Sequence, residues 1–431
     1  MRRNPQGTVC FCVCLMAFAI NGRVVAQTIA PESLSTEQPA NSNNQTTSSP
    51  LPIENTPPVS PSVRRFHYEL KIDLRGAYDD NINLAPTNKI EDYYFRIDPS
   101  LFLGFGDFEG RQDNFARFEY APDFVFFLDH SNFDTVQHAF RFDGQEHFSR
   151  LTLSGSEDIQ IAEGSDFNGV TSNGSIVNSV NLDVRGQPSV NTFNTQLNAA
   201  YDLGGKTSLS GGLQSSISDY SQFISSETFA GNVFVNYAYS PKISVGIGGS
   251  GGHQFVDAPS PDQTFEQANV RLSYNATGKL AFSGSDGVEF RQSDNSTSDY
   301  VSPVFELDLT YAPFDGTTFT LSGSRRTTNS ANLAGQDFTA TQLTASLRQR
   351  LLDRFAVSLT GGYTNQSYFQ TISAASSTRD DNYYFIQPTI DVRVTRYFFA
   401  GIYYLHREDQ SSLANFSFNE NQAGLHASLN F

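Results

Sequence analysis

The sequence has no tryptophan, and its only three cysteines, Cys10, Cys12 and Cys14, lie close to the N-terminus. If this N-terminal segment is removed, the remaining chain has no disulfides and no thiol chemistry. Beyond that segment the sequence lacks any run of 18 consecutive apolar residues, so no transmembrane helix is expected. The formal net charge of −17 excludes nucleic acid as a natural partner, because an acidic chain repels phosphate.

The first residues have the pattern of a secretory signal peptide. Arg2 and Arg3 precede a short apolar core from Thr8 to Ile20, and small residues end the segment at Ala26. We predict a signal peptide over residues 1–26, cleaved after Ala26. A membrane anchor is the alternative, but the core is too short to span a bilayer. Cleavage removes three arginines and moves the net charge from −17 to −20.

Residues 27–62 are dominated by Ser, Thr, Asn, Gln and Pro. Such a segment buries too little apolar surface to order itself, so we predict a disordered periplasmic tail. A partner ligand or a spacer to the cell wall stays open as an alternative. The third predicted region, residues 63–431, has a different pattern.

From Phe66 onward, apolar and polar residues alternate with a period of two, which is typical of β-strands with one apolar face. Tight turns rich in Gly, Pro, Asp and Asn alternate with longer polar connections, as in Tyr239–Lys242 and Tyr274–Lys279. Eight short and nine long connections predict an all-β, antiparallel up-and-down transmembrane barrel of about 18 strands. Sixteen strands are the alternative. Four prolines fall inside predicted strands, where bulges near the outer rim are expected to accommodate them: Pro99, Pro122, Pro303 and Pro388.

The chain ends on Phe431, after an alternating run in which Leu425, Ala427 and Leu429 share its face. This ending, the cysteine-free acidic body and the tight turns resemble bacterial outer-membrane β-barrels, and within them the β-barrel porin type 2 family. The resemblance covers residues 63–431 and implies the outer membrane of a Gram-negative cell. It implies that Leu429 and Phe431 form an insertion signal for the barrel-assembly machinery. Some members of the family are associated with exopolysaccharide gene clusters.

If the apolar parity faces lipid, the opposite parity lines the lumen, because a lipid-facing Arg or Lys near the midplane costs about 2–4 kcal/mol. The charged residues of this parity concentrate in the first and last strands, whereas the middle strands carry uncharged polar groups. Either these charges set a field across the pore, or they neutralise one another in cross-strand pairs. The predicted pore-lining residues are Lys71, Asp73, Arg75, Arg96, Asp98, Arg117, Glu119, Arg141, Asp143, Asp391 and Arg393.

The longest connection, residues 161–189, is the third long loop. In general porins the third loop folds inward and narrows the channel, and position and length match here. Its Ser, Asn and Gly content also suits a mobile surface loop. Aromatic residues of inward parity, such as Phe102, Phe127 and Phe234, would favour sugar stacking or a filled lumen over free diffusion.

These patterns predict a passive porin-like channel for small hydrophilic solutes, not an enzyme, with no cofactor. No Ser-His-acid or metal-binding spacing can be recognised. The alternatives are an exopolysaccharide export component and a structural barrel with a closed lumen. The expected partners are outer-membrane lipid and lipopolysaccharide, and solutes or polysaccharide. A homo-oligomer stays open.

Overall fold

The computed structural model describes residues 66–106, 114–164, 180–184, 188–294, 299–352, 354–372 and 379–431. The predicted signal peptide and tail, residues 1–26 and 27–62, lie outside the described residues and stay predictions. Most of the long connection over residues 161–189 also lies outside the described residues.

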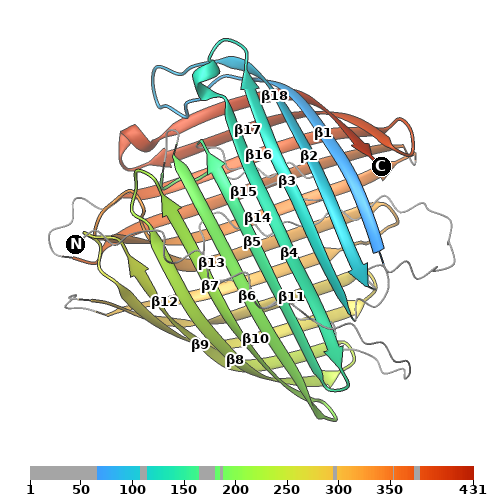
Figure 1. Cartoon of the computed structure of the whole chain (residues 1–431), viewed down its shortest axis with the longest axis vertical. Coiled ribbons are helices and arrows are strands. Elements are labelled where there is room, and N and C mark those ends of the chain that lie inside the picture. The colour runs from blue at the N-terminus through green and yellow to red at the C-terminus, as the bar shows by residue number, and fades with distance from the viewer. Residues whose placement is uncertain are drawn as a thin grey trace. The chain divides into compact units, whose positions relative to one another are not determined.

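The described chain forms one antiparallel sheet of 18 strands, in which each strand pairs with its neighbours in sequence and β1 pairs with β18. The ring is therefore closed, and Figure 1 shows the first and last strands side by side. The prediction of an 18-stranded barrel is confirmed. The strands are β1 (Phe66–Asp79), β2 (Asp92–Gly106), β3 (Phe115–Phe127), β4 (Thr135–Phe148), β5 (Leu151–Glu163), β6 (Ser189–Gly204), β7 (Thr207–Tyr220), β8 (Ser226–Ser240), β9 (Ile243–Val256), β10 (Gln263–Thr277), β11 (Leu280–Ser293), β12 (Tyr300–Tyr311), β13 (Thr317–Asn329), β14 (Gln336–Leu351), β15 (Phe355–Gln370), β16 (Asp380–Arg393), β17 (Phe398–Ser411) and β18 (Phe418–Asn430).

The last residues of the chain close the ring. The β1–β18 ladder runs from Lys71 opposite Asn430 to Asp79 opposite Gln422. Phe431 extends it, because its N–H donates to the carbonyl of Leu70 at 2.8 Å and its carbonyl accepts from the Leu70 N–H at 3.3 Å. The C-terminal alternating run is thus a strand, as predicted, and its final residue completes the hydrogen bonding between the first and last strands.

Side chains alternate between the two faces of the wall. Exposure alternates along β2. Tyr93 and Phe95 are 57% and 56% exposed, whereas the residues that follow each of them, Tyr94 and Arg96, are only 7% and 5% exposed. Polar contacts between strands that are not neighbours, such as that from Tyr94 to Tyr403 of β17, join residues of the buried parity. Such contacts can form only across a concave inner face. The outside is therefore apolar and the inside polar, the arrangement that a bilayer requires of a barrel.

Apart from the β2–β3 connection, the shorter connections lie at the end of the barrel where β1 begins and β18 ends. Some connections at the opposite end are also short, since only residues 330–335 lie between β13 and β14. The strands continue because the ladder satisfies backbone groups whether the side chains are apolar or polar.

The expectation of bulges at the prolines is wrong. Between β2 and β3 the register is the same on both sides of a gap, with Ile97 opposite Phe124 and Leu101 opposite Tyr120. Pro99 and Pro122 lie in that gap, and Pro388 lies in a similar gap between β16 and β17. Each proline lacks an N–H, so a few backbone hydrogen bonds of the ladder are missing. The register of the strand is nevertheless the same on both sides of the gap.

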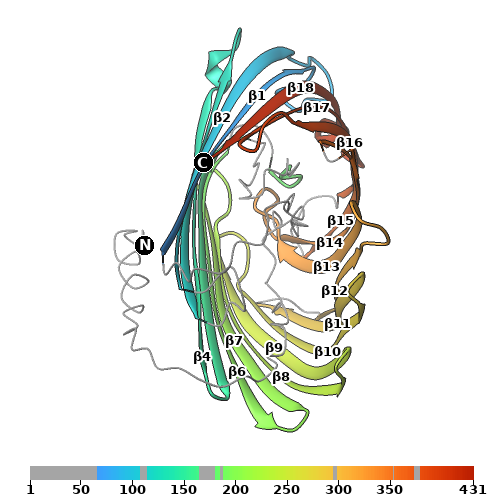
Figure 2. The ribbon, with the colours of Figure 1, turned by 90° about the vertical axis from the view of Figure 1, so that its right-hand side faces the viewer.

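The wall between β12 and β13 differs from the others. β12 pairs with β11 along its whole length, up to Tyr300, but with β13 only as far as Phe305 opposite Arg325. Beyond Arg325, β13 stays paired with β14 alone. Figure 2 shows the end of this hairpin inside the ring of strands. We call residues 326–339 the inner hairpin.

The parity of the wall can be tested at the middle of β7, where Leu213 is 65% exposed and the adjacent Gln214 belongs to the inward parity. We expect Leu213→Lys to destabilise the folded barrel in vesicles, with a free energy of unfolding about 2–4 kcal/mol smaller than that of the native protein. The reason is that the ammonium group faces hydrocarbon. The matched variant Gln214→Lys should change it by less than about 1 kcal/mol, since its side chain points to a polar interior. Urea titration in lipid vesicles measures both, and equal losses would contradict the assigned parity.

Candidate functional site

The candidate functional site is the inner face of the barrel, which carries the predicted pore-lining residues in separate clusters at different heights. The upper cluster, towards the long connections, centres on Arg96. Its guanidinium contacts the carboxylates of Asp98 at 3.0 Å and Asp123 at 2.5 Å. Arg75 lies opposite Arg96 in register, and its guanidinium is 5.7 Å from the centre of the Tyr403 ring. This cluster joins β1, β2, β3 and β17.

A second charged cluster lies lower, where β3 to β5 approach their short turns. Arg117 contacts Asp143 at 2.5 Å, and Arg141 lies 3.5 Å from Asp143 and 3.7 Å from Asp158. Glu119 is opposite Arg141 in register. The arginine side chains are 37% and 52% exposed, so this cluster presents charge to the lumen, whereas that of Arg96 is buried.

The remaining predicted residues lie near the closure of the ring. Lys71 pairs with Asp73 at 2.6 Å, and Asp391 contacts the ring of His426 at 2.8 Å. Arg393 lies opposite Phe399 near the short-turn end. The predicted residues thus form several clusters and do not form one ring. Most of them pair with opposite charges on the same or a neighbouring strand.

The middle wall contains charged residues that the sequence reading missed. Glu289 and Arg291 of β11 pair at 2.8 Å and are almost fully buried. Arg271 of β10 donates to Asn236 and Ser210 at 2.7 and 2.6 Å and covers the ring of Phe234 at 4.1 Å. The strands β6 to β8 alone suggested an uncharged middle wall, but β10 and β11 add charged side chains to it.

A glycine stripe on β9 makes room for these groups. A Cβ atom at Gly248 would clash with Phe234, and one at Gly252 would clash with Phe265. Both rings can lie flat against the wall because glycine has no side chain, and an arginine covers each of them. The glycine-rich run from Gly246 to Gly252 was the signal in the sequence for this close approach.

Part of the longest connection lies inside the ring. The described residues 180–184 are all buried, and Figure 2 shows this short green segment among the strands. Val180 and Leu182 pack in an apolar cluster with side chains from β1, β2, β16, β17 and β18. This described part agrees with the inward fold, one of the two alternatives left open for the third long loop, while residues 165–179 and 185–187 lie outside the described residues.

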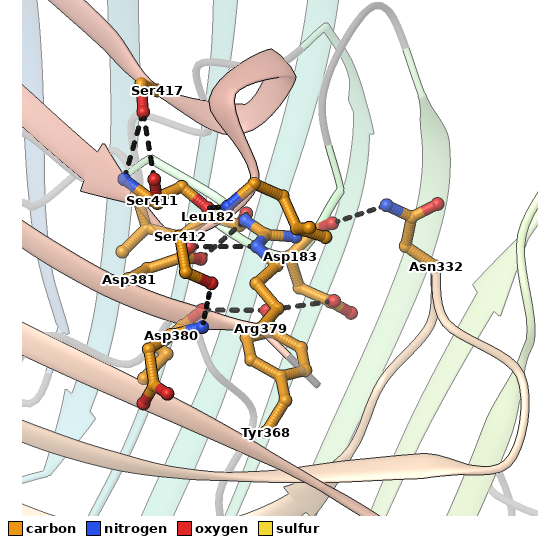
Figure 3. A network of polar contacts seen from close by, with 12 residues as sticks. Leu182, Asp183, Asn332, Tyr368, Arg379, Asp380, Asp381, Ser411, Ser412 and Ser417 are labelled. Atoms are coloured by element: carbon orange, nitrogen blue, oxygen red, sulfur yellow. Dashed lines mark hydrogen bonds and ion pairs between the residues drawn. The ribbon is translucent and has the colours of Figure 1, made fainter. Parts of the chain in front are cut away.

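Asp183 fixes this segment to the inner hairpin. Its carboxylate accepts hydrogen bonds from the Ser330 hydroxyl at 2.7 Å, the Ala331 N–H at 2.6 Å and the Tyr368 hydroxyl at 3.1 Å. Asn332 donates to its backbone carbonyl at 3.1 Å. Figure 3 shows Asp183 between Asn332, Tyr368 and Arg379. One side chain thus ties together two segments that occupy the lumen.

Arg379 holds the same segment from the other side. Its guanidinium donates to the carbonyl of Leu182, pairs with Asp381 at 2.5 Å and stacks on the ring of Phe416 at 3.8 Å. Burial raises the pKa of the Asp183 carboxyl above its ordinary value, although the Ser330 hydrogen bond and the Arg379 charge act in the opposite direction. The charged carboxylate therefore costs free energy in this position.

Among the described residues, no group of three or more His, Cys, Asp or Glu side chains could hold a metal ion. No helix in the described part of the chain is long and apolar enough to cross a membrane.

No protein-family model matches the sequence, and no curated protein matches it. Solved structures are similar in fold. OccK2 (OpdF) of Pseudomonas aeruginosa has 9% identity and a TM-score of 0.45, over 86% of this chain and 99% of that one. OccAB4 of Acinetobacter baumannii has 11% identity and a TM-score of 0.42, over 84% and 98%. The outer membrane protein OpdK of Pseudomonas aeruginosa has 10% identity and a TM-score of 0.41, over 85% and 99%. Likenesses this distant carry no argument about function.

The upper charged cluster allows a direct test. We expect Arg96→Met to destabilise the barrel by about 3–5 kcal/mol, because it leaves the buried carboxylates of Asp98 and Asp123 without their counter-charge. The control Arg141→Met removes a half-exposed guanidinium and should cost less than about 1 kcal/mol. Urea unfolding in vesicles measures both. Adding Asp123→Asn to Arg96→Met should restore part of the loss, and no restoration would argue against the pairing.

Proposed function

We propose that this protein is an outer-membrane channel through which small hydrophilic solutes diffuse passively. The support is a closed barrel of 18 strands with an apolar outside and a polar inside. Barrels of 16 to 18 strands leave an aqueous lumen. The outer membrane of a Gram-negative cell is where single-chain barrels of this kind occur.

Two segments of the chain itself occupy the lumen. This observation supports a selective channel rather than an open pore. Residues 180–184 and the inner hairpin lie inside the ring and are held by Asp183 and Arg379. Specific hydrogen bonds and ion pairs hold them in one arrangement. A lumen narrowed in this way passes solutes selected by size and charge.

Within this proposal the predicted pore-lining residues have two roles. Arg117 and Arg141 are the charges that a passing solute meets, since their side chains are substantially exposed. Arg96 and its carboxylates are buried and instead stabilise the wall. The field along the solute path then comes mainly from the lower cluster, near the short-turn end.

A structural barrel with a closed lumen is the second candidate, and the buried segment 180–184 is the observation that favours it. Export of a polysaccharide has less support, because a polymer would have to displace both inner segments. Membership of the β-barrel porin type 2 family stays a prediction. So does the insertion signal at Leu429 and Phe431, although Phe431 lies in the closing rung.

Single-channel recording in planar bilayers tests the channel and its narrowing. We expect steady conductance from the native protein and at least a twofold larger conductance from Asp183→Ala, because the variant loses the carboxylate that accepts three of the hydrogen bonds holding the inner segments. The control Asp219→Ala alters an exposed carboxylate at the end of β7 and should leave conductance unchanged. No conductance from either the native protein or Asp183→Ala would instead support the closed barrel.

The pH dependence of this conductance has a defined sign. The docked segment raises the pKa of Asp183 above the ordinary aspartate value of about 3.9, so the docked state binds the proton more tightly. Protonation of Asp183 therefore stabilises the docked segment. This stabilisation is complete at a pH below the ordinary aspartate pKa and is lost as pH rises through the raised pKa of Asp183. Conductance should therefore fall as pH is lowered through that window.

The variant Asp183→Asn imitates the protonated carboxyl and should show little change over the same pH range. If acidification raised conductance in the native protein but not in Asp183→Asn, the sign derived from burial would be wrong.

A further inference from the structure

The wall of the barrel is interrupted between β12 and the inner hairpin. Residues Tyr300–Val304 of β12 have no ladder partner in β13, whose residues 326–329 pair only with β14. We call this stretch the seam. Pro303, which has no N–H to donate to a ladder, lies within it.

The inner hairpin separates from β12, while its β14 side stays paired with β15, and its polar groups bond to strands on the other side of β12. The Gln254 side-chain amide donates to Asn329 at 2.7 Å, and that of Gln263 donates to Asp337 at 2.7 Å. Arg291 donates to the Thr327 carbonyl at 3.0 Å. These contacts run from β9, β10 and β11 to β13 and β14, and they hold the hairpin behind the seam.

At one end of the seam, Tyr300 contacts strands beyond β13 directly. Its ring stacks on Phe369 of β15 with centres 4.0 Å apart, and its hydroxyl lies 3.1 Å from that of Thr339 on β14. Side chains, not backbone hydrogen bonds, therefore close the wall at this end. Side-chain contacts separate at lower cost than a ladder, since no buried backbone groups lose their partners.

Behind the seam lies a cavity of about 90 Å³. Val304 and Phe305 line it on the side of the seam, and amide and hydroxyl side chains of β7 to β11 line its far side. Its lining has three arginines, at 291, 325 and 326, against two glutamates, at 289 and 306. Arg325 donates to Thr341 at 2.6 Å, while its buried Nε atom has no partner.

We propose that the seam is a lateral portal for a single-chain amphiphile with an anionic head, such as a carboxylate. The hydrocarbon chain lies in the seam, where Val301 is 55% exposed on the outer face and Val304 faces inward. The head lies in the cavity beside Arg325, where the lining carries one more positive than negative side chain.

The absence of tryptophan makes a clean optical test possible. A single tryptophan at Val304→Trp reports from the cavity, and Phe234→Trp is the control on a fully paired part of the inner wall. Each variant is placed in vesicles at pH 8 and titrated with 2-bromododecanoate, whose bromine lies beside the carboxylate head and quenches indole fluorescence at short range. We expect saturable quenching of Val304→Trp and at least fivefold weaker quenching of Phe234→Trp.

Two further comparisons test the head and the route. With Val304→Trp, 2-bromododecan-1-ol should quench at least fivefold more weakly than the carboxylate, and Arg325→Met should remove that difference. Cross-linking Tyr300→Cys to Phe369→Cys with a short bismaleimide should abolish quenching. The control pair, Leu307→Cys with Gly323→Cys, lies opposite in the intact ladder and should have no effect when cross-linked.

Absence of quenching in Val304→Trp would overturn the portal. Quenching that survives the Tyr300–Phe369 cross-link would assign entry to the aqueous lumen and also overturn it. Equal quenching by the alcohol would overturn the anionic head. Conductance through the lumen does not depend on the seam, so these outcomes are independent of the proposed channel function.

Discussion

The structure depends on one constraint, that every backbone polar group facing hydrocarbon must find its partner within the protein. Closing the β1–β18 ladder satisfies it, down to the paired Leu70 and Phe431. Once the ring is closed, each strand has one face to lipid and one to the lumen, and the alternation along the sequence decides which residue goes where. Charges such as Arg96 then have no low-cost position except inside, where carboxylates on the same and neighbouring strands meet them.

The polar groups of the inner face explain what fills the lumen. The residues of β13 beyond Arg325 are polar and turn inward together with the start of β14. There, Asn329, Asp337 and the Thr327 carbonyl bond with Gln254, Gln263 and Arg291. Residues 180–184 add an apolar contact on one side and Asp183 on the other. The cost is a wall without a ladder between Tyr300 and Val304, closed by side chains alone. The narrowing of the lumen and the seam in the wall are thus two consequences of one displaced hairpin.

Much of the fold was predictable from the sequence, because strand periodicity and turn chemistry are local. The parity of β2, the position of tight turns and the number of strands follow from residues adjacent in the chain. The response to proline was not predictable, since whether Pro99 causes a bulge or a missing rung depends on Pro122, which faces it from the next strand. The role of Arg291 was also hidden, because its partners Gln254, Gln263 and Thr327 come from three other strands.

The sequence by itself determined the barrel, its parity and its inward charges, because a bilayer leaves a strand only two faces and hydrophobicity assigns them. It also placed Arg96 and Asp123 on the same face, though not in contact. The tertiary structure alone decided which charges pair, where residues 180–184 lie and which rungs are lost. Those outcomes depend on stagger between strands and on contacts across the lumen, and neither leaves a periodic signal along the chain.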